Sequence, residues 1–247
     1  MVTAAPQDQW RLLDVQDHDL KLAQLAHRGR VLPEHERAAE LEQRLRVLGD
    51  QVVSARTKAG DLARDLARAE ADVDQVRQRS RRNATRMESG QGSPKDLQAL
   101  QHEIASLAQR QETLEDIQLE VMERVEAAQA TVAEREAEVG RIEAELAEVT
   151  RSRDQALSAI EDESAEVGRA RADAVAGIPG DLLALYEKVR ERSGGIGAAR
   201  LYGRRCLGCR IELTSADIGR IRQAASDTVL RCEECGRILV RTPDSGL

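Results

Sequence analysis

Four cysteines, all within the last 42 residues of the 247-residue chain, are the side chains whose spacing points most directly to chemistry. Cys206 and Cys209 form one Cys-x-x-Cys pair, and Cys232 and Cys235 form a second pair after 22 intervening residues. Two sulfurs of one tight turn can bind the same metal ion, and two such turns complete a tetrahedron with Zn–S bonds of about 2.3 Å. The spacing therefore predicts a zinc ribbon that holds one structural Zn²⁺.

The turns themselves and the choice of metal follow from neighbouring residues. We expect Gly208 and Gly236 to adopt the positive φ that lets backbone N–H groups point at sulfur. Iron in a rubredoxin-like site uses the same ligands, but such a site usually lies beside aromatic side chains, which are missing here. Four thiolates leave no open coordination position, so the site is predicted to be structural rather than catalytic.

Other signs of catalysis are missing from the sequence. It contains no P-loop, no GxGxxG and no GxSxG motif. The histidines are scattered along predicted helices and are interpreted as surface residues: His18, His27, His35 and His102. We therefore expect no enzymatic activity and no small-molecule substrate.

The composition is typical of long helices. About half of the chain consists of Ala, Glu, Lys, Leu and Arg, whereas there are one Trp, two Tyr and no Phe. Aromatic side chains supply much of the buried area of ordinary cores. Their scarcity here argues against one large globular core and against an ordinary α/β enzyme fold. No stretch approaches 18 apolar residues, and the first 19 residues do not resemble a signal peptide. We expect a cytoplasmic protein with no membrane partner.

Heptad patterns predict how the helices pair. Apolar or small residues recur in steps of four and three from Leu41 to Met87, and again from Leu97 to Val149 with a continuation to Ala174. A Gly/Ser/Pro break at residues 89–94 separates the two patterns. The predicted fold class is therefore mainly α, with a long antiparallel coiled-coil helical hairpin followed by a small C-terminal zinc ribbon with short β-strands.

The predicted domains follow from these boundaries. Residues 1–176 form the coiled-coil hairpin, with a short N-terminal helix at 8–29 and arms at about 34–89 and 95–176. The N-terminal helix is expected to use Leu13, Leu20 and Leu25 to pack near residues 153–174. Residues 177–199 form a short helix and a linker, and residues 200–247 form the ribbon, with strands predicted at 210–213, 228–231 and 237–241. Ser93 is the expected N-cap of the second arm, and either Thr214 or Ser215 is the expected N-cap of a short ribbon helix.

Two clusters of arginines interrupt an otherwise acidic chain. The net charge is −7, but residues 200–241 carry nine Arg against five acids, an excess of +4, so the rest of the chain carries −11. The candidate nucleic-acid contacts are, in the ribbon, Arg204, Arg205, Arg210 and Arg237, and near the hairpin turn, Arg77, Arg79, Arg81 and Arg82. Alternatively, the ribbon arginines offset the −2 charge of a Zn(Cys)₄ centre, and the others form a solvated helix face. Tyr202 is the one stacking candidate beside the ribbon, and a packing role is expected for it.

Three stretches resemble a bacterial family of coiled-coil hairpin proteins with a C-terminal C4-type zinc ribbon. They are residues 94–104 at the hairpin turn, residues 186–190 before the ribbon, and residues 232–239 at the second cysteine pair. The turn has Asp96-Leu97 where the family more usually has Glu-Tyr. The resemblance implies a curved helical rod bearing a zinc ribbon, and a binding protein: members have been connected with the alternative sigma factor sigma-54, with secretion components and with mRNA.

Two functions are consistent with these features. The first is a non-enzymatic adaptor that binds RNA or DNA phosphates through the basic ribbon, with the coiled coil as a spacer. The alternative is a protein–protein adaptor or chaperone-like regulator of a transcription or secretion component. Binding of arginines to phosphates weakens steeply with salt, whereas an apolar helix-face interface does not, so salt dependence separates them.

Overall fold

The computed structural model describes residues 2–247, which group into two compact units. One unit comprises residues 36–150, and the other comprises residues up to 35 together with residues 151–247. We call them the hairpin unit and the ribbon unit. Two long helices, α2 (Pro33–Glu88) and α3 (Pro94–Val175), contribute to both units.

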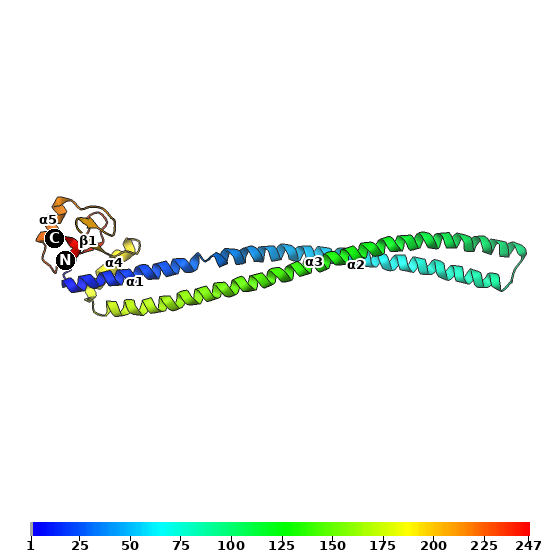
Figure 1. The fold of residues 1–247 in the computed structure, drawn as a ribbon, viewed down its shortest axis with the longest axis horizontal. Coiled ribbons are helices and arrows are strands. Elements are labelled where there is room, and N and C mark those ends of the chain that lie inside the picture. The colour runs from blue at the N-terminus through cyan, green and yellow to red at the C-terminus, as the bar shows by residue number, and fades with distance from the viewer. Residues whose placement is uncertain (1) are drawn as a thin grey trace. The chain divides into compact units, whose positions relative to one another are not determined.

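The hairpin unit consists of the antiparallel pair α2 and α3, which run side by side to a shared turn (Figure 1). Two apolar clusters show how the two helices pair: Leu41 and Leu48 pack on Ile142, and Leu62 packs on Val125 and Ala128. Every position of the predicted heptad seams in this unit is buried or half-buried. The predicted fold class, long helices forming a hairpin with a small C-terminal strand region, is confirmed.

The turn of the hairpin is built as its sequence predicts. Gly90 and Gly92 have φ angles of +64° and +141°, which a side chain disfavours. Ser93 is the N-cap of α3: its hydroxyl accepts from the Asp96 N–H at 3.3 Å, and the Asp96 carboxylate accepts from the Ser93 N–H at 2.9 Å. This reciprocal pairing satisfies two of the otherwise free donors at the helix start.

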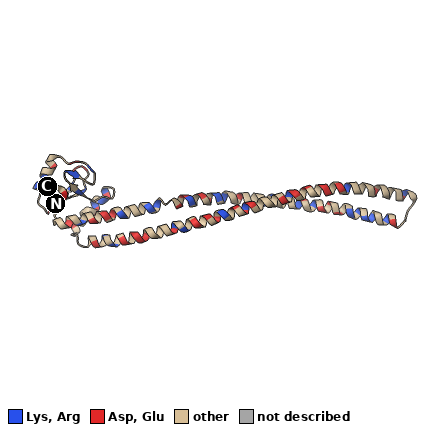
Figure 2. Ribbon diagram, viewed as in Figure 1, with Lys and Arg blue, Asp and Glu red and all other residues tan. Residues whose placement is uncertain are grey.

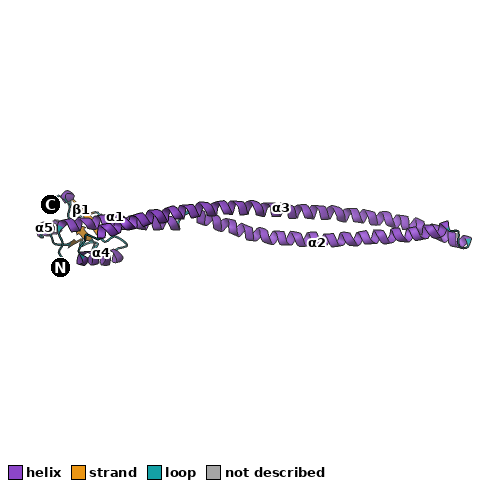
Figure 3. Cartoon of the chain, turned by 90° about the horizontal axis from the view of Figure 1, so that it is seen from below, coloured by secondary structure: helices purple, strands orange, loops and turns teal. Residues whose placement is uncertain are grey.

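In the ribbon unit, α1 (Pro6–Arg30) packs against the last part of α3 (Figure 3). Gly29 lies against Leu157 and Ile160, and Glu163 forms ion pairs with Lys21 and Arg28 at 2.7 and 3.1 Å. This packing confirms the predicted contact with residues 153–174.

The buried face of α1 differs from the predicted one. Leu25 is buried as expected, but Leu20 is 38% exposed, and Leu12 and Val15 are buried instead. The reason is that α1 also packs against α4 (Gly180–Arg192) and the strands. The predicted face assumed contact with α3 alone, so it is displaced around the helix from the face that is buried.

The strands form one small sheet in the order β2-β1-β4-β3, which comprises β1 (Ala198–Tyr202), β2 (Arg205–Cys206), β3 (Leu230–Arg231) and β4 (Ile238–Val240). The β1–β4 pair is parallel and the other two pairs are antiparallel. The strand predicted at 210–213 is wrong, because only Glu212 bridges to Arg205. β1 begins two residues before the predicted start of the ribbon.

Two short helical segments complete the ribbon unit. The N-cap of α5 (Ser215–Gln223) is Thr214, one of the two predicted residues, and its hydroxyl accepts from the Asp217 N–H. A 3₁₀ turn, η1 (Pro243–Ser245), precedes the C-terminus. Across residues 2–247, no helix has the length and apolar character needed to span a bilayer.

Candidate metal centre and its basic surroundings

The four cysteine sulfurs converge on one point in the ribbon unit. Their Sγ atoms all lie within 4.8 Å of one another, and the Sγ atoms of Cys209 and Cys232 are 3.9 Å apart. Tetrahedral coordination with Zn–S bonds of about 2.3 Å requires S–S distances of about 3.8 Å. Cys206 and Cys232 are buried, and Cys209 and Cys235 are half-buried. The donor set fits one tetrahedral Zn²⁺ with no position left for a substrate or water.

Backbone N–H groups around the site favour thiolates. The N–H groups of Gly208 and Cys209 donate to Cys206, and those of Glu234 and Cys235 donate to Cys232. Burial nevertheless outweighs these bonds and raises the pKa of Cys206 to about 12. A bound dication supplies the charge that keeps such buried sulfurs deprotonated, so metal binding and folding of the ribbon are coupled.

The two glycines of the cysteine turns have different roles. Gly236 has a φ of +69°, as predicted. The prediction of a positive φ at Gly208 is wrong; Gly208 is required for space, because a Cβ there would lie 2.8 Å from the Ala199 Cβ and 2.9 Å from the Arg237 Cδ. In the first turn the positive φ falls instead on Arg210, at +64°.

Comparison with known proteins places these features in a family. Residues 15–194 match the CT398-like coiled-coil hairpin domain, and residues 205–239 match the C4-type zinc ribbon domain. The chain belongs to the CT398-like coiled-coil hairpin family. The C4-type match, together with the four clustered sulfurs, supports zinc rather than iron as the bound metal.

Relatives of similar length occur in mycobacteria. An uncharacterized protein of Mycobacterium tuberculosis (strain ATCC 25618 / H37Rv) is 36% identical over 230 residues, which cover 93% of this chain and 94% of that protein. A solved structure from Mycobacterium smegmatis is 38% identical with a TM-score of 0.83 and covers 97% of this chain and all of that one. CT398 from Chlamydia trachomatis, at 16% identity, shares the fold with a TM-score of 0.64, over 96% of this chain and 98% of that chain. Neither family description names an enzymatic activity.

Among the candidate phosphate contacts of this family member, the ribbon arginines fall into two groups. Arg237 is half-buried and donates to the backbone carbonyls of Ser193, Ile196 and Gly208 at 2.9 to 3.3 Å, which ties the linker to the first cysteine turn. Arg204 donates to the Ser215 hydroxyl at 2.8 Å and lies 3.7 Å from the Glu212 carboxylate. The other two candidates are exposed, and within residues 2–247 their side chains have no hydrogen-bond or ion-pair partner: Arg205 and Arg210.

The candidates near the hairpin turn also divide. Arg77 pairs with Glu115 at 2.7 Å and Arg79 with Glu103 at 2.5 Å, so both link α2 to α3. Arg81 and Arg82 are exposed, and no partner is found for them among the described residues. Basic residues follow one another along this end of α2, whereas charges of both signs alternate elsewhere on the hairpin (Figure 2).

The exposed aromatic side chains were not anticipated. Tyr202 is 60% exposed, so the packing role predicted for it is wrong. It is the last residue of β1, and its side chain lies at the surface. Trp10 is 40% exposed, whereas Tyr186 is completely buried. Two of the three aromatic residues of the chain therefore lie on the surface of the ribbon unit. Their rarity is the sequence signal that would have singled out Trp10.

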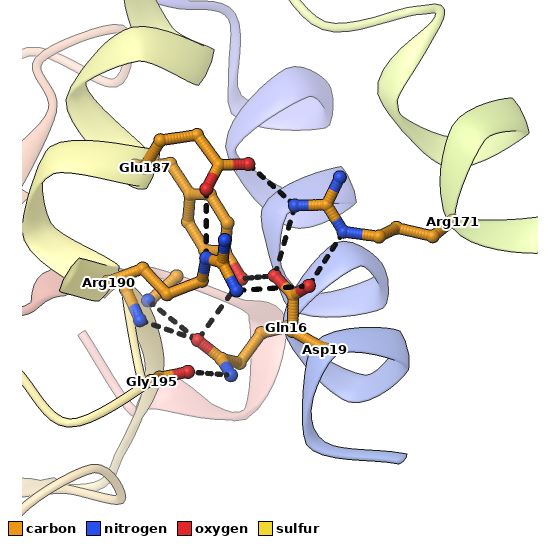
Figure 4. Close-up of polar contacts among 9 residues, drawn as sticks. Gln16, Asp19, Arg171, Glu187, Arg190 and Gly195 are labelled. Carbon is orange, nitrogen blue, oxygen red and sulfur yellow. Dashed lines mark hydrogen bonds and ion pairs between the residues drawn. The ribbon is translucent and has the colours of Figure 1, made fainter. Parts of the chain in front are cut away.

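A buried polar network that sequence reasoning missed positions the ribbon (Figure 4). The Asp19 carboxylate of α1 accepts from Arg171 at 2.6 Å and from the Tyr186 hydroxyl at 2.7 Å, and Arg171 also binds Glu187. Burial raises the pKa of Asp19, but the bonds from Arg171 and Tyr186 outweigh burial and leave this pKa below its ordinary value.

The same network holds the start of the sheet. Gln16 Oε1 accepts from the N–H groups of Gly197 and Ala198 at 2.6 and 3.3 Å, while its Nε2 donates to the Gly195 carbonyl at 3.1 Å. Gly197 has no room for a side chain, since a Cβ would lie 2.7 Å from the Tyr186 ring. Together these contacts fix where β1 leaves the linker, and hence the orientation of the first cysteine turn.

Proposed function

We propose that the protein is a non-enzymatic cytoplasmic adaptor that binds single-stranded RNA or DNA through the zinc ribbon. The observation that carries the proposal is the exposure of Tyr202 opposite Arg205. These residues are Cα partners in the antiparallel β1–β2 register at the edge of the sheet, so their side chains leave the same face of this strand pair. Aromatic rings stack on bases and arginines contact phosphates, and this pairing is the usual platform for single strands.

The charge distribution supports the same surface. The excess of +4 over residues 200–241 leaves about +2 after subtraction of the −2 charge of a zinc–thiolate centre. Because Arg205 and Arg210 have no acidic partner among the described residues, their charge is available to a polyanion. The rest of the chain is strongly acidic, which directs a polyanion to the ribbon.

A non-catalytic role agrees with the chemistry of the site. The metal has four protein ligands and no open position, and such sites serve structure. The ribbon then acts as a rigid mount for Tyr202, Arg205 and Arg210, all of which are within five residues of Cys206 in sequence.

The test is a salt titration of the zinc-loaded chain with a labelled single-stranded RNA and with single-stranded DNA. The double variant Arg205→Gln/Arg210→Gln should lose affinity for unrelated sequences by about the same factor. It should also flatten the slope of log K against log salt by about 1.4. A double variant with the same charge change in the hairpin unit, Arg64→Gln/Arg68→Gln, is the control and should keep the wild-type slope. Zinc content should stay at one per chain in both.

The alternative, a protein–protein adaptor, is favoured by two apolar side chains on the first cysteine turn. Leu207 and Ile211 are 47% and 46% exposed. If neither RNA nor DNA binds at low salt, nucleic-acid binding is wrong and this alternative takes its place. A partner captured from lysate through these residues should resist both nuclease and high salt.

A further inference from the structure

A hollow in the ribbon unit lies where α1, α5 and the C-terminal turn meet. Its volume is about 630 Å³, within the range of roughly 300–1,000 Å³ that is typical of sites for small ligands. Half of the ten residues that line it are apolar: Pro6, Trp10, Ile221, Pro243 and Leu247. The proposed function does not use this hollow.

Trp10 is held so that its ring remains available. The indole Nε1 donates to the Arg241 carbonyl at 2.6 Å, which fixes the edge of the ring, yet the side chain is 40% exposed. An indole with its donor satisfied and its ring open to a hollow is a preformed stacking surface.

Polar groups at the hollow are suited to an aromatic ligand with an anionic group. Arg222 is exposed, and the one hydrogen bond of its side chain found among the described residues is to the Gly246 carbonyl, at 3.5 Å. No acidic side chain lines the hollow in the described part of the chain. Gln9 is 98% buried, and its Nε2 donates to the carbonyls of Ala4 and Ser226. Among the described residues no hydrogen bond to its Oε1 is found, so this oxygen can accept from the amino group of a base.

The hollow and the surface proposed to bind nucleic acid are linked by one turn. The C-terminal turn that lines it contacts the end of β1, where the Gly203 N–H donates to the Asp244 carbonyl at 3.5 Å and Arg200 lies 3.8 Å from the Asp244 carboxylate. Gly203 follows Tyr202 directly, so one short turn adjoins both exposed aromatic residues of the chain.

We propose that this hollow takes one unstacked nucleobase of a single-stranded nucleic acid, with the base stacked on Trp10 and a neighbouring phosphate bound by Arg222. The inference rests on the proposed function and adds a second stacking position to it. Base specificity beyond stacking would come from Gln9 Oε1, which favours bases that carry an exocyclic amino group, namely adenine, cytosine and guanine.

The single tryptophan makes the proposal directly testable, because all tryptophan fluorescence reports on this hollow. The zinc-loaded full chain is titrated with a 12-nucleotide single-stranded RNA and with an abasic strand of the same length, followed by both anisotropy and Trp10 fluorescence. We expect the base-bearing strand to quench Trp10 and to bind about tenfold more tightly than the abasic strand. The abasic strand should bind through its phosphates without quenching.

Two variants separate stacking from charge. Trp10→Leu should remove most of the preference for the base-bearing strand and leave the salt slope unchanged. Arg222→Gln, an exposed change that spares the core, should flatten that slope by about 0.7 while quenching remains. Arg68→Gln in the hairpin unit is the charge-matched control and should change neither quantity.

The outcomes distinguish this inference from the function on which it rests. If the RNA binds more tightly than the abasic strand while Trp10 fluorescence is unchanged, the base pocket is wrong and the ribbon proposal stands. If neither strand binds at low salt, both proposals fall.

Discussion

Replacing Asp19 by Asn should destabilise the ribbon unit selectively and in a pH-dependent way. The Asp19 side chain is 5% exposed and accepts from Arg171 and Tyr186, with Arg190 3.5 Å away. Breaking a buried pair costs about 3–5 kcal/mol, and a hydrogen bond to a charged group contributes about 1.5–3 kcal/mol. Because Arg171 keeps Glu187 as a partner, we expect the free energy of unfolding to fall by about 2–3 kcal/mol, near the lower end of these ranges.

The pH dependence follows from the direction of the shift. The pKa of Asp19 is lower in the folded state than in the unfolded chain, so its contribution is fully present above the unfolded value of about 3.9. It is lost as the pH falls through the lowered folded-state pKa. Wild type and Asp19→Asn should therefore differ by a constant amount from about pH 5 to 8 and converge in acid.

Urea unfolding followed by Trp10 fluorescence measures this effect, because the only tryptophan lies in the ribbon unit. The midpoint of the variant should fall by about 1–2 M urea at pH 7. Asp14→Asn is the matched control: it makes the same charge change on an exposed position of α1 and should leave the midpoint in place. Equal midpoints for the two variants between pH 5 and 8 would refute the assignment of stability to the network.

Three further results are expected. Gly208→Ala places a Cβ 2.8 Å from the Ala199 side chain and should weaken zinc binding at least tenfold, as measured by chelator competition. The control Gly219→Ala adds a Cβ with no atom within 4 Å and should leave zinc binding unchanged. Arg210→Gly relieves a φ of +64°, so zinc should bind about fivefold more tightly; an unchanged affinity would mean that the conformation carries no strain. Removal of zinc by a chelator should change Trp10 fluorescence but leave most of the far-UV helical signal, which comes from α2 and α3; loss of that signal would contradict the two-unit description.

The parts of the fold that follow local periodicity were predictable from the sequence. A heptad repeat specifies which side of a helix is buried wherever the partner is another long helix, so the positions from Leu41 to Val149 could be assigned without knowledge of the partner's residues. The metal ligands were predictable for a related reason, since each Cys-x-x-Cys turn contains its own chelating geometry. The predicted domain boundaries at 176 and 199 and the assigned nucleic-acid contacts stay predictions.

Features that depend on distant partners were missed. Gln16 and Asp19 look like the wet face of a helix, but they are buried by groups more than 150 residues away, such as Arg171 and Tyr186. The first two residues of β1 were interpreted as linker, because Ala198 and Ala199 carry little apolar signal and follow a Gly-rich stretch. Their strand conformation comes from parallel pairing with β4, some 40 residues further along the chain.

The small sheet explains why the metal site and the helices depend on one another. Along β4, Ile238 and Val240 belong to the core formed with α1 and α4, whereas Leu239 belongs to the core around the cysteines and α5. β1 alternates in the same way, with Ala198 on the helix side and Ala199 on the cysteine side. Because successive residues of a strand point to opposite faces, β4 and the start of β1 are buried on both sides and separate the two cores. Loss of zinc therefore removes the packing from one face of the sheet, whose other face packs on α1. Weaker packing of α1 in turn destabilises the strands that carry the cysteine turns.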